Sequence, residues 1–139
     1  MGCDAAAAII YGFPFEGEDF DPVPEYQEDS GKWLAKFQGL PEPEGSFLTN
    51  DAEWSKYWSD RRTLPINTTC DGDTCRGETT DYLCVRESML AGSWGGATEI
   101  PVGHIKEPPP EWDALLREFC EKAGIPFGKP KWYLIASYG

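Results

Sequence analysis

The chain has 139 residues, of which 40% are hydrophobic and 14% aromatic, and this apolar content excludes a disordered chain. Its 24 Asp and Glu against 12 Lys and Arg give a formal net charge of −12. Such a charge argues against direct binding to nucleic acid and against association with an anionic membrane. The length predicts one globular domain over residues 1–139.

The first predicted element is a β-strand from Ala5 to Tyr11. Its residues are apolar without polar alternation, which is typical of a strand buried on both faces. Gly12-Phe13-Pro14 is expected to end it. Residues 16–31 are rich in acidic residues and contain two prolines. This composition predicts a surface loop, held to the body by the rings of Phe20 and Tyr26.

A short helical turn is predicted next, because Trp33, Leu34 and Phe37 have helical spacing. Prolines and glycine in residues 40–45 indicate a break after it. A second helix is predicted to begin at Asn50, which fits an N-cap position and has an acidic residue three positions later, as in a capping box.

One face of this second helix carries an aromatic stripe, made by Trp54, Tyr57 and Trp58 and extended by Arg61. Large aromatic side chains are buried more often than they are exposed. We therefore interpret the stripe as part of the core rather than as an exposed binding face.

Two strands are predicted at Leu64–Thr69 and Thr80–Ser88, joined by a polar loop at Cys70–Thr79. The second strand is apolar on both faces, which indicates an interior strand. A flexible turn at Gly92–Gly96 and a short strand at Thr98–Lys106 follow.

The most strongly predicted helix spans Pro110–Ala123. Proline suits its first turn, Gly124 suits the position after its last residue, and its apolar residues recur at the helical period. Lys131–Tyr138 is predicted as a strand apolar on both faces. The order of elements favours an α+β fold, with a mostly antiparallel sheet covered by this long helix and by one or two shorter ones.

Cysteine usage favours a reducing compartment, because the five cysteines cannot all pair. No secretory signal and no membrane-spanning segment is recognisable, and the expected location is the cytoplasm. Met1-Gly2-Cys3 matches the start of a lipidation motif, but Ala6 stands where that motif has Ser or Thr. The sequon at Asn67 would matter only in a secreted chain.

Cys70 and Cys75 flank an Asp-Gly turn signal, and three structures fit them. A disulfide could close the turn, or both thiolates could form half of a metal site that lacks a second ligand pair. The third structure, a polar turn with two free thiols, is favoured. We predict no metal site and no cofactor.

No motif specifies a reaction, and no catalytic residue is predicted. His104 is the only histidine. The segment Gly92–Gly96 matches neither a P-loop nor a dinucleotide-binding fingerprint. The leading hypothesis is therefore a non-enzymatic acidic protein that docks on a basic partner protein, as an inhibitor, an antidote or a nucleic-acid mimic does. The acidic residues expected to make this contact are Glu16, Glu18, Asp19, Asp21, Glu25, Glu28 and Asp29.

Two alternatives remain open. One is a small enzyme or ligand-binding domain, with a pocket near the glycine loop that includes Trp94 and His104. The other is a structural or assembly subunit, which would bury a large apolar patch against copies of itself. The sequence does not decide the oligomeric state.

Overall fold

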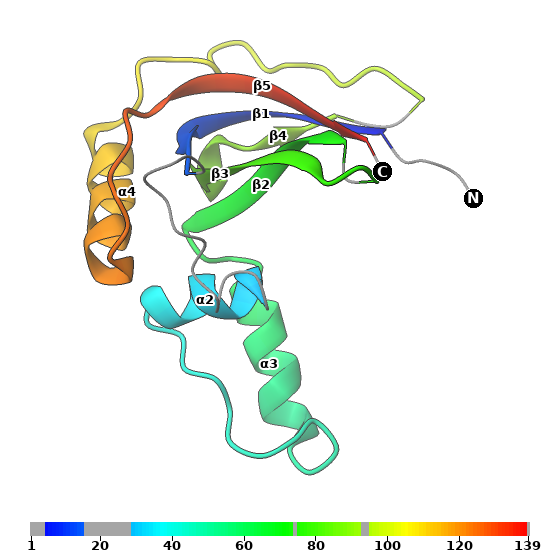
Figure 1. The fold of residues 1–139 in the computed structure, drawn as a ribbon, viewed down its shortest axis with the longest axis vertical. Helices are drawn as coiled ribbons and strands as arrows, with labels where there is room; N and C mark the ends of the chain where they lie inside the picture. Colours follow the sequence, from blue (N-terminus) through cyan, green and yellow to red (C-terminus); the bar gives the residue numbers. More distant parts are fainter. Residues whose placement is uncertain (1–4, 16–28, 74, 93–94, 139) are drawn as a thin grey trace.

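The computed structural model describes residues 5–15, 29–73, 75–92 and 95–138 (Figure 1). It is an α+β protein with a five-stranded mixed sheet and three α-helices. In chain order the elements are β1 (Ala5–Pro14), α2 (Ser30–Phe37), α3 (Asp51–Arg61), β2 (Ile66–Asp73), β3 (Glu78–Val85), the 3-10 helix η1 (Arg86–Ser88), β4 (Leu90–Ala91), α4 (Pro110–Ala123) and β5 (Lys131–Tyr138). Among the described residues, no helix is long and apolar enough to span a membrane.

The strands of the sheet follow the order β3-β2-β5-β1-β4, and β1 also pairs directly with β3. The predicted antiparallel arrangement is wrong at one place, since β2 runs parallel to β5 at Gly72–Asp73. The sheet is therefore mixed. β5 lies between β2 and β1, which confirms that the last predicted strand is an interior strand of the sheet.

Gly12 is the point at which β1 bends from one partner strand to the other. It lies opposite Lys131 of β5 and also opposite Cys84 of β3. A Cβ atom at this position would overlap the carbonyl oxygen of Leu83. Only glycine allows the two backbones to approach so closely.

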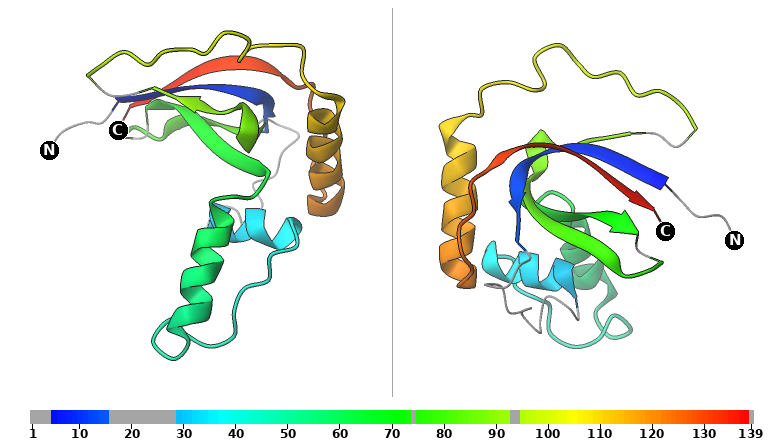
Figure 2. Two further views of the ribbon diagram at one scale, coloured as in Figure 1. Left: turned by 180° about the vertical axis from the view of Figure 1, so that it is seen from behind. Right: turned by 45° about the horizontal axis from the view of Figure 1, so that its top comes forward.

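The main core lies between the sheet and helices α2 and α4 (Figure 2). The two helices contribute Trp33, Leu34, Trp112, Leu116 and Phe119 to it, among others. A smaller cluster on the opposite side of the strands contains Ile10, Tyr82, Cys84 and Ile135. Leu83 and Val85 belong to the main core and are also fully buried. The prediction that β3 is buried on both faces is confirmed.

Helix α4 matches its predicted bounds, and local signals explain why. Pro110 occupies its first turn, where a missing N–H costs nothing, and Gly124 ends it with φ 72°. Trp112, Leu116 and Phe119 are buried on the stripe that the 3.6-residue period predicted. Local chemistry thus determines this helix.

Several predicted strand boundaries are wrong. The strand predicted to end at Ser88 ends at Val85, since Arg86–Ser88 form the 3-10 helix η1. β1 continues through Gly12, Phe13 and Pro14, because proline is tolerated at the end of a strand that has found a partner in β3. The predicted loop at 70–79 is mostly strand, since β2 and β3 pair up to Asp73 and Glu78. The β-branched threonines in both strands favour this longer ladder.

Two further expectations fail. No strand forms at 98–106, where Pro101 lacks an N–H and Gly103 adopts a φ of 82°. The expectation that β5 is apolar on two buried faces is wrong for Leu134, which is 77% exposed, whereas Ile135 is buried. β5 therefore buries one face near its centre and exposes the other.

Candidate functional site

Most of the acidic residues expected to bind a partner lie outside the described residues, namely Glu16, Glu18, Asp19, Asp21, Glu25 and Glu28. Asp29 is described and has two contacts. Its Oδ1 accepts a hydrogen bond from the backbone N–H of Lys32, as the N-cap of α2, and lies 3.2 Å from Nη2 of Arg61. Asp29 therefore stabilises the start of α2 and holds Arg61 in place.

The other predicted site residues do not share one described pocket. Trp94 lies outside the described residues. His104 is half-buried, its Nε2 lies 2.9 Å from the backbone oxygen of Ser88, and its ring lies 5.8 Å from the ring of Trp132. Gly92 and Gly95 line a cavity of about 520 Å³, together with Asp73, the first alanines of β1 and the end of β5. His104 is not among the described residues that line this cavity.

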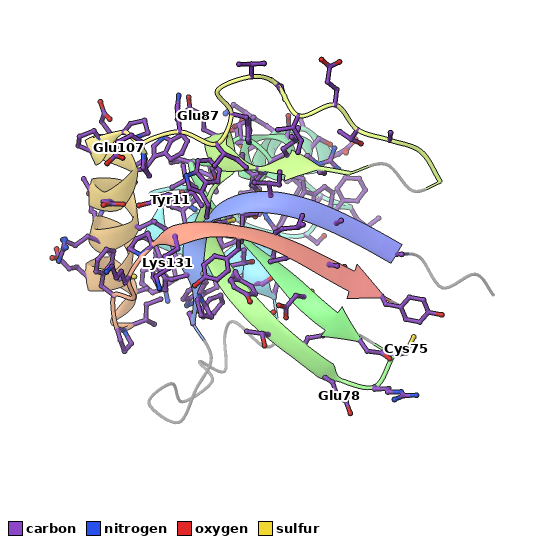
Figure 3. All side chains as sticks on the ribbon, turned by 90° about the horizontal axis from the view of Figure 1, so that it is seen from above. Tyr11, Cys75, Glu78, Glu87, Glu107 and Lys131 are labelled. Atoms are coloured by element: carbon purple, nitrogen blue, oxygen red, sulfur yellow. The ribbon has the colours of Figure 1, made fainter. Side chains whose placement is uncertain are left out.

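The cysteines of the β2–β3 hairpin, Cys70 and Cys75, are not joined by a disulfide in the structure. Cys70 lies within β2 opposite Asp81, and Cys75 is exposed at the tip of the hairpin, at the far end of the sheet from α4 (Figure 3). Asp73 organises this tip by accepting hydrogen bonds from the backbone N–H groups of Cys75 and Arg76. Within the described ranges, no group of three or more His, Cys, Asp or Glu side chains is arranged to hold a metal ion.

Tyr11 takes part in a hydrogen-bonded cluster where β1 meets α4 (Figure 3). Its hydroxyl donates to Oδ1 of Asp113 at 2.7 Å, and Nε1 of Trp112 donates to Oε2 of Glu87 at 3.3 Å. Burial, and secondly the hydrogen bond to Asp113, raise the pKa of Tyr11 to about 12. The ring is only 5% exposed, so this cluster joins α4 to the sheet rather than forming an open site.

The aromatic stripe of α3 is the clearest departure from the sequence prediction. Tyr57 is buried, but Trp54 is only half-buried and Trp58 is 41% exposed. Figure 1 shows why: α3 runs away from the sheet instead of lying on it. The prediction that the whole stripe is core is therefore wrong, because helical spacing defines a shared face but not what covers that face.

The turn before α3 adds two more exposed apolar side chains to this face. Phe47 is 43% exposed, and its ring lies 5.2 Å from that of Trp58. Leu48 is 92% exposed. We call Phe47, Leu48 and Trp58 the docking tip. The connection between α2 and α3, which contains Phe47 and Leu48, reaches the end of the molecule farthest from the sheet (Figure 1).

Hydrogen bonds fix the shape of the docking tip. The backbone N–H groups of Thr49 and Asn50 both donate to the carbonyl oxygen of Ser46, at 3.1 and 3.0 Å. The hydroxyl of Thr49 accepts from the backbone N–H of Ser46 at 3.1 Å. Phe47 and Leu48 occupy the two central positions of this closed turn. The turn presents them without a large entropy cost when they bind.

Three acidic residues flank the Phe47–Leu48 turn in the sequence, namely Glu44, Asp51 and Glu53. Nδ2 of Asn50 donates to the backbone oxygen of Glu44 and to Oε2 of Glu53, which brings these two residues together. The second bond joins side chains, so Asn50 does not form the capping box that the sequence predicted. In the described part of the chain, none of the three carboxylates forms an ion pair.

A groove of about 1120 Å³ lies beside the docking tip, between α2 and α3. Trp54, Tyr57 and Trp58 line it from α3, and Lys32 lines it from α2. Lys32 is ion-paired with Glu42 at 2.8 Å, and this contact raises the pKa of Lys32. Nε1 of Trp54 is buried and has no hydrogen-bond partner among the described residues. The groove thus has a wall of aromatic side chains.

Sequence reasoning missed Phe47 and Leu48, although a signal was present. Ser46 and Thr49 are turn-forming residues that can bond to nearby backbone groups, and they enclose two large apolar residues. Apolar residues at the centre of a turn have no strand or helix partner to cover them. Such a pattern indicates an exposed apolar pair.

Comparison with known proteins identifies no relative from which a function could be transferred. No protein-family model, curated protein or solved structure matches the chain at a significant level.

Proposed function

We propose that this protein is a non-enzymatic binding protein that docks on a basic partner protein through the docking tip. The single observation that carries the proposal is the exposure of Leu48, which is 92% exposed on a hydrogen-bonded turn beside two further exposed rings. Covering large apolar side chains releases about 1.5–3 kcal/mol for each one that becomes fully buried. Apolar anchors at the centre of an interface supply most of its affinity.

Charge supports a basic partner. Glu44, Asp51 and Glu53 flank the Phe47–Leu48 turn in the sequence and are not neutralised by a described base. An apolar centre with an acidic rim complements an apolar patch surrounded by Lys and Arg. The net charge of −12, to which the acidic segment 16–29 contributes, adds long-range attraction and faster encounter.

The neighbouring groove extends the surface on which a partner can bind. A partner side chain that enters it can stack on Trp54 and Trp58. The proposed interface therefore combines the docking tip, its acidic rim and this groove.

The test is affinity capture from the native cells with immobilised wild-type protein, followed by mass spectrometry. We expect basic proteins to be captured and to be lost with the double variant Phe47→Ser/Leu48→Ser. The matched control is Val102→Ser, which removes an equally exposed apolar side chain from another part of the surface. Capture that survives the double variant but not the control would refute the proposed interface.

Charge reversal tests the acidic part of the proposal separately. Glu44→Lys/Asp51→Lys/Glu53→Lys and Glu18→Lys/Asp21→Lys/Glu25→Lys should each weaken binding to the captured partner, and the wild-type affinity should fall as salt rises. The control is Glu118→Lys/Glu121→Lys on α4. If the affinity for the partner changes neither with salt concentration nor in either triple variant, the acidic residues do not contribute to binding.

A further inference from the structure

The base of α3 carries a second feature, a cavity of about 330 Å³ between the start of α2, the end of α3 and the start of β2. Three arginines line it: Arg61, Arg62 and Arg86. No carboxylate belongs to its described lining. The chain has only 12 basic residues against 24 acidic ones, so a quarter of its basic residues meet in this cavity.

Two of the three guanidinium groups are held in place by the protein. Arg86 donates from Nε to the backbone oxygen of Leu64 at 2.6 Å and from Nη2 to that of Arg61 at 3.4 Å. Arg61 donates from Nη2 to Asp29 and places its guanidinium over the ring of Tyr57 at 5.4 Å. These contacts fix the positions of both groups before any ligand arrives.

Most of the donors in the cavity remain unused. A guanidinium has five N–H groups. Among the described residues, Arg86 uses two of these groups and Arg61 uses one, and the side chain of Arg62 makes neither a hydrogen bond nor an ion pair. Among the described carboxylates, Asp29 alone is paired with any of the three arginines. Three cations close together therefore face one anion, and their mutual repulsion is relieved when a further anion enters.

The end of a helix explains only part of this arrangement. Arg61 and Arg62 lie at the C-terminal end of α3, where its dipole favours cations. Arg86 comes from η1, after β3, and so belongs to a different part of the chain. Convergence of arginines from two separate elements on one cavity is what a site for an oxyanion requires, because guanidinium groups bind phosphate and carboxylate oxygens in pairs.

We propose that this cavity, which we call the arginine pocket, binds a small ligand through its phosphate or carboxylate group. The volume is near the lower limit of small-molecule sites, about 300 Å³, which suits a compact ligand. Trp58 also lines the arginine pocket and offers a flat apolar surface. A ligand with a ring beside its oxyanion can stack on that surface while Arg61, Arg62 and Arg86 bind the oxygens.

Isothermal titration calorimetry of the full chain, with inorganic phosphate, citrate and phenyl phosphate at constant ionic strength, tests the proposal. We expect saturable binding that also raises the melting temperature. The tighter of phosphate and citrate identifies the class of oxyanion. Phenyl phosphate should bind more tightly than inorganic phosphate, and Trp58→Leu should remove this difference.

Arg62→Gln is the decisive variant, because Arg62 makes no described contact that stabilises the fold. It should weaken oxyanion binding by about tenfold or more without lowering the melting temperature of the unliganded protein. The control is Arg76→Gln at the hairpin tip, which should bind like the wild type. Absence of saturable binding, or equal losses in Arg62→Gln and Arg76→Gln, would overturn the proposal. The variant Phe47→Ser/Leu48→Ser should bind inorganic phosphate normally, because neither residue lines the arginine pocket, so the two proposals fail independently.

Discussion

Replacement of Gly12 by alanine tests whether the close approach of β1 and β3 holds the sheet together. The added Cβ would overlap the carbonyl oxygen of Leu83 and lie 2.8 Å from Cα of Cys84. Both neighbours are backbone atoms of fully buried residues, so they cannot turn aside as a flexible side chain can. The two strands have to separate instead.

The expected cost has two parts. Separation weakens the backbone pairing of Gly12–Pro14 with β3, and each hydrogen bond lost costs roughly 0.5–1.5 kcal/mol. Overpacking of a close-packed core costs a further 1–3 kcal/mol, roughly. We therefore expect Gly12→Ala to lower the free energy of unfolding by about 2–5 kcal/mol.

Urea denaturation followed by tryptophan fluorescence measures this loss. Gly96→Ala is the matched control, because a Cβ there has no heavy atom within 4 Å and the backbone is not left-handed. The free energy of unfolding of the control should lie within about 0.5 kcal/mol of the wild-type value. If the free energy of unfolding of Gly12→Ala also lies within about 0.5 kcal/mol of the wild-type value, the close approach of β1 and β3 does not require glycine and the prediction is refuted.

Three further predictions concern buried polar and ionisable groups. Ser88→Ala should lower the free energy of unfolding by about 1–3 kcal/mol, because the Ser88 hydroxyl is the only described partner of the Tyr11 backbone N–H. Urea denaturation measures this loss, and an unchanged urea midpoint would contradict the prediction. The raised pKa of Tyr11, from 10 to about 12, keeps the folded form neutral while the unfolded form ionises, so the contribution of Tyr11 to stability is complete below pH 10 and falls by up to about 2–3 kcal/mol between pH 10 and 12. In denaturation curves recorded at pH 9 and pH 11, Tyr11→Phe should therefore lose less stability between the two pH values than the wild type does. Burial raises the pKa of Cys84 to about 12 and that of Cys120 to about 11, so a thiol reagent should label exposed Cys75 first. Mass spectrometry of the labelled native protein checks this order. Equal labelling of all three cysteines would contradict the burial of Cys84 and Cys120.

Elements with strong local signals could be predicted from the sequence. Pro110, the apolar stripe and Gly124 together determine α4, and each acts within a few residues of its neighbours. The apolar sequence neighbours of Cys84 and Cys120 predict two buried free thiols, and both are buried and free in the structure. These features depend on helical period and local composition rather than on distant partners.

Features that depend on distant partners could not be predicted. The parallel contact between β2 and β5, and the bend of β1 at Gly12, arise when strands from opposite parts of the chain meet. Nothing in a single strand indicates which neighbour it will have or in which direction that neighbour runs. The glycine that permits the close approach was therefore interpreted as the end of a strand.

The exposure of the candidate site could not be predicted from the sequence for the same reason. Trp54, Tyr57 and Trp58 do share one face, as their spacing predicted, but exposure depends on whether another element covers that face. In this fold α3 stands away from the sheet and leaves Trp58 partly uncovered (Figure 2). Likewise, the arginine pocket forms only because Arg86, after β3, lies beside the end of α3.

The pairing of β1 with β5 has a consequence for biosynthesis. Ala5 pairs with Tyr138, and the ladder continues without interruption to Gly12 and Lys131. A ribosome therefore completes β1 long before its main partner strand exists, and the apolar residues Ile9–Phe13 stay uncovered on the nascent chain during that interval. Contacts between such distant residues also form slowly, in milliseconds to seconds for strand-rich domains. Newly made chains should consequently depend on chaperones until β5 has left the exit tunnel.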